Sequence, residues 1–180
     1  MVLTKPNRRE YGMQDTYRYN VPITTLAAGL APPTAVTHAP YRTYEYTVND
    51  NSLFQVPVPS DWLADPASTM DIYVRWCCNE NFALASADIQ WRIVYDSVDQ
   101  NNQILGAAAT TATLDTGDID IPTTALQIQE TNIGTIIAAN LAAVDTIGIE
   151  LWRIASTTTP TAEPAVIECW VEYTRFINSY

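Results

Sequence analysis

The sequence predicts an all-β protein, an eight-stranded antiparallel sandwich or jelly roll with an extended N-terminal arm. Three observations support this fold class. From residue 41 onward, apolar and polar residues alternate with a period of two, which is typical of half-buried strands. Clusters of Asn, Asp, Gly and Ser separate these stretches, and such residues favour turns. Their even spacing favours short antiparallel strands over a parallel fold.

Four stretches show the alternation clearly and four show it more weakly. In residues 71–78, Ile72, Val74 and Trp76 share one face of the predicted strand, while polar residues occupy most of the other. The four clear strands are residues 71–78, 89–95, 147–154 and 166–173. The four weaker strands are residues 41–48, 53–58, 104–114 and 126–133. Residues 135–144 are a helical alternative, long enough for about three turns, that would not change the fold class.

The composition indicates one folded domain that does not bind nucleic acid. The chain has 180 residues, of which 47% are hydrophobic, so it can bury a sizeable core. Its formal net charge is -11, with only 9 basic residues. Binding to nucleic acid needs clustered Lys and Arg against the phosphates, so this charge argues against a packaged genome as the partner.

The first forty residues form a separate region of the sequence, and we expect an arm at 1–40 followed by a body at 41–180. Five prolines disfavour a helix or a central strand there and favour extended backbone. Apolar residues of the arm would be costly to leave in water as a group, so the arm needs a surface. That surface is either its own domain or a neighbouring subunit. The arm is also more basic than the body, which suggests docking on an acidic partner.

The cysteines and the first residues give no sign of a disulfide framework or of a leader. The three cysteines are Cys77, Cys78 and Cys169, an odd number without metal-ligand spacing, so we expect neither a disulfide framework nor a zinc site. Residues 1–10 are polar and basic, and no apolar stretch follows that would resemble a signal peptide or a membrane span. We therefore expect synthesis in the cytoplasm and a soluble chain until it assembles.

Residues suited to catalysis or metal binding are scarce. His38 is the only histidine and lies in the proline-rich arm, where a general base is poorly placed. Asp115, Asp118 and Asp120 could hold calcium, but their spacing lacks the other features of a calcium loop, so we interpret them as a solvated turn. We predict that the chain is not an enzyme and holds no metal or cofactor.

The tryptophans divide into strand residues and one loop residue. Trp76, Trp91, Trp152 and Trp170 fall in predicted strands, where we expect them to pack in the core or on a sheet. Trp62 follows a Pro-Ser-Asp sequence in a predicted loop. It either covers one end of the sandwich or stacks on a sugar.

The order of these strand motifs resembles the small jelly-roll structural proteins of tailed bacteriophages, of the capsid decoration or cement type. The matching motifs are the F-Q-V-P-V-P-S-D-W segment, the I-Y-V-R-W strand, the W-R-I-V-Y strand, the L-W-R strand and the closing V-E-Y strand. The resemblance covers roughly residues 50 to 175. It implies an eight-stranded jelly roll with no catalytic signature, and it does not extend to the arm.

The resemblance further implies a virion protein on the outer capsid surface that binds the major capsid protein and stabilises capsomer boundaries. It also implies a homo-oligomer, a trimer in similar proteins, without a nucleic-acid or membrane partner. Related patterns leave two alternatives open: a carbohydrate-binding module of a tail fibre or spike, and a single jelly-roll capsid subunit. For the first role we expect the arm to contact the capsid through Lys5, Arg8, Arg9, Tyr11, Tyr17, Arg18 and Tyr19; for a glycan, Trp62 is the expected contact.

Overall fold

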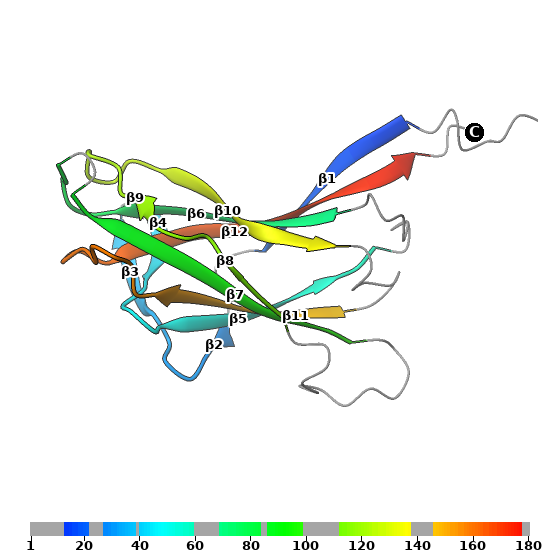
Figure 1. Cartoon of the computed structure of the whole chain (residues 1–180), viewed down its shortest axis with the longest axis horizontal. Coiled ribbons are helices and arrows are strands. Elements are labelled where there is room, and N and C mark those ends of the chain that lie inside the picture. Colours follow the sequence, from blue (N-terminus) through cyan, green and yellow to red (C-terminus); the bar gives the residue numbers. More distant parts are fainter. Residues whose placement is uncertain are drawn as a thin grey trace, which may run out of the picture.

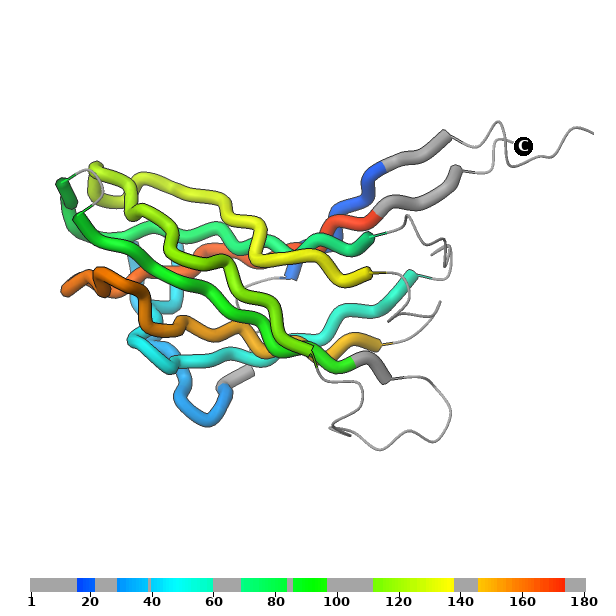
Figure 2. Tube along the Cα trace, in the orientation of Figure 1, coloured from blue at the N-terminus to red at the C-terminus, as the bar shows by residue number. Residues whose placement is uncertain are grey.

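The structure, a computed structural model, describes seven stretches of the chain. These are residues 13–21, 27–38, 40–59, 69–83, 86–98, 112–137 and 146–177. Side chains are described for the same residues except 13–15, 27–28, 97–98 and 174–177. Figure 2 colours the residues whose side chains are described along the trace. No helix in these stretches is long and apolar enough to cross a bilayer.

All regular elements in the described stretches are strands. In chain order they are β1 (Met13–Val21), β2 (Ala27–Ala28), β3 (Thr34–His38), β4 (Tyr41–Glu45), β5 (Asn51–Pro57), β6 (Thr69–Cys78), β7 (Asp88–Val98), β8 (Ala112–Asp115), β9 (Ile119–Asp120), β10 (Gln129–Ile137), β11 (Thr146–Ile154) and β12 (Pro164–Ile177).

The strands form two antiparallel sheets that lie face to face (Figure 1). The first sheet has the order β10-β6-β12-β4-β3, with β1 also paired to β12, and the second has the order β2-β5-β11-β7-β8, with β9 also paired to β7. From β4 to β12 the chain passes to the opposite sheet at each connection, with one exception: β7, β8 and β9 follow one another within the second sheet. Four strands in each sheet joined in this way make a jelly roll. The expected fold class is therefore confirmed.

Seven of the eight predicted strands are present, and the described end of the eighth also lies in a strand. They correspond to β4, β5, β6, β7, β8, β10, β11 and β12, whereas β1, β2, β3 and β9 are additional. The predicted strand at residues 104–114 is described only from Ala112. Within the proposed helical alternative, Thr135, Ile136 and Ile137 belong to β10, and the rest lies outside the described residues.

The period-two pattern explains the core. In β6 the buried and half-buried residues alternate from Thr69 to Trp76, and Met70, Ile72, Val74 and Trp76 all point into the core. Trp76 and Trp91 are both fully buried there, with ring centroids 6.3 Å apart in an edge-to-face arrangement. Burial of such aromatic surface is a large favourable contribution to folding.

The turn chemistry also matches the sequence. Asn49, between β4 and β5, has a φ of 74°, and Gly117, between β8 and β9, has a φ of 72°. Asn and Gly tolerate this left-handed backbone better than other residues. In the first turn the Thr47 amide donates to Asp50 Oδ2 at 2.7 Å, which fixes the loop locally.

The described part of the arm adds strands to both sheets. β1 pairs with β12 and β3 pairs with β4 in the first sheet, while β2 pairs with β5 in the second. The sequence left open whether the arm lies on its own domain or on a neighbouring subunit. The described residues of the arm lie on their own domain. Whether residue 40 marks a domain boundary stays a prediction.

Candidate functional site

The most distinctive surface lies on the ribbon formed by β1 and β12. β1 pairs with β12 from Met13↔Ile177 to Val21↔Cys169. The pairing of β12 with β6 ends at Tyr173, so beyond this residue β12 has β1 as its one neighbour among the described strands. In Figure 1 this two-stranded ribbon projects past the ends of the other strands. We call it the β1–β12 ribbon.

On the outer side of the sheet, Arg18 of β1 covers Trp170 of β12. Its guanidinium carbon lies 3.8 Å from the Trp170 ring centroid, which is a cation–π contact. Arg18 Nη2 also lies 3.3 Å from Glu168 Oε2, and Arg18 Nε donates to Asn20 Oδ1 at 2.6 Å. Trp170 is only 2% exposed, although it is not part of the core cluster. Arg18 is thus held within its own chain.

Two residues of β6 complete the surroundings of Trp170. The Tyr73 ring stacks on it with an interplanar angle of 3° and a centroid distance of 5.1 Å. Arg75 lies 5.2 Å from the same ring and donates from Nη1 to Glu168 Oε2 at 2.7 Å. Arg75 Nε also donates to Glu130 Oε1 at 2.9 Å, so the network reaches β10. Around Trp170, these polar and aromatic side chains on the outer face of the sheet therefore form one connected set of contacts.

The other side of the ribbon exposes tyrosines. Tyr17 is 40% and Tyr19 is 36% exposed. Their cross-strand partners are Tyr173 and Val171, which belong to the core, so both tyrosines lie on the core side of the sheet but at its edge. Tyr17 and Tyr173 are in ring contact with centroids 5.2 Å apart. Tyrosine is enriched in protein interfaces because it combines apolar area with a polar group.

His38 lies near one carboxylate, but the arrangement does not favour catalysis. His38 Nε2 is 3.6 Å from Glu45 Oε1. Glu45 lies in the cross-strand row Glu45–Ala165–Cys77. Burial raises the pKa of the Cys77 thiol, and the neighbouring Glu45 raises it further. A thiol that stays protonated near neutral pH is a poor nucleophile.

Of the three aspartates predicted as a solvated turn, Asp115 and Asp118 accept hydrogen bonds from other side chains. Arg92 donates to Asp115 through two hydrogen bonds of 2.7 Å, and these hold the pKa of that carboxyl below its usual range. Asp118 accepts hydrogen bonds from Thr157 and from Gln90, which also lower its pKa. Asp120 lies opposite Asp88 across β9 and β7. Within the described residues no group of His, Cys, Asp and Glu is arranged to hold a metal ion.

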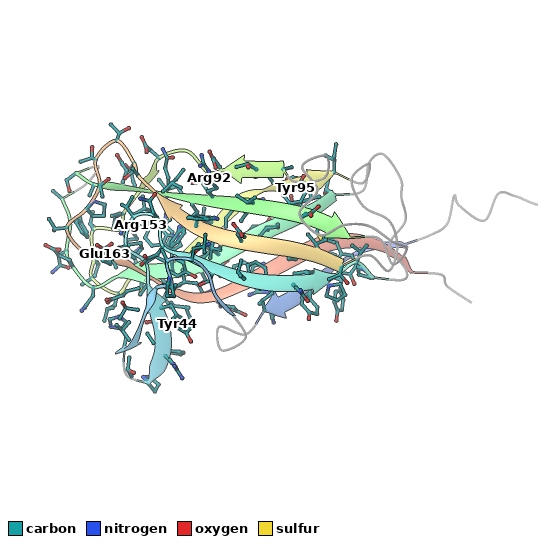
Figure 3. The ribbon with its side chains drawn as sticks, turned by 90° about the horizontal axis from the view of Figure 1, so that it is seen from below. Tyr44, Arg92, Tyr95, Arg153 and Glu163 are labelled. Carbon is teal, nitrogen blue, oxygen red and sulfur yellow. The ribbon has the colours of Figure 1, made fainter. Side chains whose placement is uncertain are left out.

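A charged pair lies at the end of the sandwich opposite the ribbon. Arg153 is 1% exposed, forms an ion pair with Glu163, and donates from Nη1 to the Tyr46 carbonyl at 2.7 Å. Figure 3 shows Arg153 and Glu163 close together at this end. Desolvation lowers the pKa of Arg153. Since Arg153 continues the inward series Ile147, Ile149 and Leu151, the period of two was a signal that could have placed it inside.

The predicted contact residues fall into two groups. Tyr17, Arg18 and Tyr19 lie on β1 as described above, and their role in binding stays a prediction. Lys5, Arg8, Arg9, Tyr11 and Trp62 lie outside the described residues. Trp152 and Trp170 pack on the outer faces of the sheets and not in the core cluster. The sequence interpretation missed the Trp170 layer, although Glu168, Trp170 and Glu172 occupy one face by their period.

No protein-family model and no curated protein matches the chain. Similar solved structures include a family 35 carbohydrate-binding module from an environmental isolate, with 13% identity, a TM-score of 0.48, and coverage of 85% of this chain and 91% of the module. The CBM36-1 domain of a multidomain xylanase from the hindgut metagenome of Trinervitermes trinervoides has 12% identity, a TM-score of 0.46, and coverage of 87% and 96%.

A chain of infectious bursal disease virus, Gx strain, has 8% identity and a TM-score of 0.43. The similarity covers 93% of this chain but only 33% of the viral chain. At these TM-scores the likenesses carry no argument about function, and the jelly-roll assignment rests on the strand order.

Proposed function

We propose that the chain is a non-enzymatic structural protein of a virus particle, a decoration or cement protein on the outer capsid surface. The observation that carries the proposal is the β1–β12 ribbon, which exposes Tyr17 and Tyr19 along the sheet edge, just before the point where the ribbon projects past the other strands. A sheet edge that exposes two tyrosines is suited to contact a protein partner. The partner in this proposal is the major capsid protein.

The two arginines at the ribbon are engaged within the chain, which supports a role in holding the ribbon in place for binding. Arg18 and Arg75 are engaged with Trp170 and with carboxylates of the same chain. In this proposal Arg18 positions β1, and the tyrosines contact the partner. Each bound copy would bury apolar surface at a capsomer boundary, and mass action would then favour the closed shell.

A sedimentation experiment tests this function. Purified protein is added to shells from which the endogenous copy has been dissociated, and the cosedimenting fraction is measured. We expect saturable binding by the native chain and binding at least about tenfold weaker after Tyr17→Ser with Tyr19→Ser, because buried tyrosines dominate many interfaces. Ile128→Ser is the matched control, since Ile128 is 56% exposed but lies between β9 and β10.

Two results would overturn the proposal. One is failure of the native chain to sediment with the shells. The other is unchanged binding by the double tyrosine variant.

A further inference from the structure

One sheet edge in the described part of the chain lacks the features that usually protect edges. β3 pairs with β4 on one side and with no described strand on the other. Its sequence is Thr-Ala-Val-Thr-His, without Lys, Arg, Asp, Glu or Pro, and its register with β4 has no irregularity. An edge strand with unpaired backbone groups and no such protection is a template for another strand.

The other described edges are each protected. β1 carries Asp15 and Arg18, and β10 carries Glu130 and a register irregularity between Asn132 and Gly134. β8 has four residues and includes Asp115, while β2 and β9 have two residues each. Charges, bulges and short length all disfavour the addition of a strand. Among the described edges, β3 is therefore the best candidate for pairing with another chain.

The hairpin of β3 and β4 has little backbone pairing to the rest of its sheet, although Thr43 of β4 is buried. β12 pairs with β4 through Ala165↔Glu45 and Val166↔Tyr44, so among the described strands only β3 pairs with the segment from Tyr41 to Thr43. Figure 3 shows the hairpin standing away from the two sheets beyond Tyr44. Thr34, Ala35 and Thr37 are exposed.

We propose that β3 is a homodimer interface, in which two copies pair antiparallel across a two-fold axis at Val36. This axis places Val36 opposite its own copy, Ala35 opposite Thr37, and Thr34 opposite His38. The second sheet neighbour of each β3 is then the β3 of the partner, and the two hairpins form one four-stranded antiparallel unit. Such a self-complementary contact is the usual form of a two-fold dimer.

Charge favours a second copy as the occupant of this edge. The chain carries a net charge of -11, so most of its surface would repel an identical chain. In the proposed register every residue of the two central strands is uncharged or histidine. Because Glu45 is the β4 partner of Thr34, His38 of one copy falls in the same cross-strand row as Glu45 of the other, while its Nε2 lies 3.6 Å from Glu45 of its own chain. No like charges face each other across the axis.

A charge-pair experiment on the purified full chain tests the interface. Analytical ultracentrifugation should give a native dimer, whereas Val36→Lys and Val36→Glu should each dissociate at least about tenfold more readily because like charges meet at the axis. An equimolar mixture of the two variants should recover a dimer, which a folding defect would not allow. A monomeric native chain, or a trimer that neither variant affects, would overturn the inference.

A cross-linking experiment tests the register by an independent route. Cα atoms of directly opposed antiparallel residues lie within the range that a disulfide spans. Under mild oxidation Val36→Cys should form a covalent dimer. The matched control Ala35→Cys should not, because residue 35 of one copy is opposite residue 37 of the other, two residues along the strand from its equivalent. The native cysteines are buried and should not interfere. Equal cross-linking of both variants would contradict the register. Neither experiment uses virus particles, so their outcome is independent of the proposed function.

Discussion

The guanidinium carbon of Arg18 lies 3.8 Å from the centre of the Trp170 ring. This contact joins a residue of the N-terminal arm to a residue of the last strand. It covers an aromatic ring that would otherwise face solvent on the outer side of the sheet. The described part of the arm thereby packs against the last strand of the body.

Arg18→Ala should reduce the free energy of unfolding by about 1 kcal/mol, through loss of the cation–π contact and of the partly exposed ion pair with Glu168. Urea denaturation followed by tryptophan fluorescence measures the change. The control is Arg42→Ala, because Arg42 is exposed and its cation–π contact with Tyr44 is longer, at 5.8 Å, and therefore weaker. Equal stabilities of the two variants would show that Arg18 does not hold β1.

Deletion of residues 1–40 should prevent folding of the body. The deletion removes β1, β2 and β3, which pair with three strands of the body, and it uncovers Trp170. Deletion of residues 1–12 is the control, because it leaves every described strand in place. Circular dichroism and thermal unfolding distinguish the two. A cooperative transition of the shorter chain, equal to that of the native protein, would contradict the assignment of β1 to the fold.

The chain should lose stability as the pH rises from about 9 to 12. Burial raises the pKa of both Cys78 and Cys169 to about 12, against an ordinary value of 9.0, and burial also raises the pKa of Tyr46. Above pH 9 the unfolded chain releases protons that the folded chain retains, so unfolding becomes more favourable, by up to about 1.4 kcal/mol per pH unit for each group.

Urea titrations across this pH range measure the slope, and Cys169→Ala should make it shallower. A free energy of unfolding that is constant up to pH 11 would be inconsistent with buried, protonated thiols.

Glu163→Gln should destabilise the protein by about 2 kcal/mol, because it removes the ion-pair partner of the buried Arg153 guanidinium. The charge of Asp50 nearby remains as partial compensation. Arg153→Met combined with Glu163→Gln should cost less than the sum of the two single changes. A double-mutant cycle based on urea denaturation gives the coupling energy. Strict additivity would indicate that the pair does not interact in solution.

The period of two was sufficient to predict the body of the fold. In β6 and β12, alternating apolar residues defined both the strands and the face that enters the core. The pairing of β1 with β12 could not be predicted, because it joins residues at opposite ends of the chain and the arm has no clear alternation. The burial of Trp170 is a consequence of that pairing. Its neighbours Glu168 and Glu172 indicated a solvent-facing residue.

The position of Arg153 illustrates the opposite case. Its spacing from Ile149 and Leu151 indicated the core, but a charge is rarely buried without a partner. The partner, Glu163, lies in the loop before β12, and only the three-dimensional structure brings it to Arg153.

The proposed role in a virus particle is tested most directly by counting copies of the chain in purified particles. Quantitative mass spectrometry against labelled peptides gives the ratio of this chain to the major capsid protein. A decoration protein predicts hundreds of copies per particle. A handful of copies would indicate a tail or spike component, and complete absence from intact particles would contradict the account.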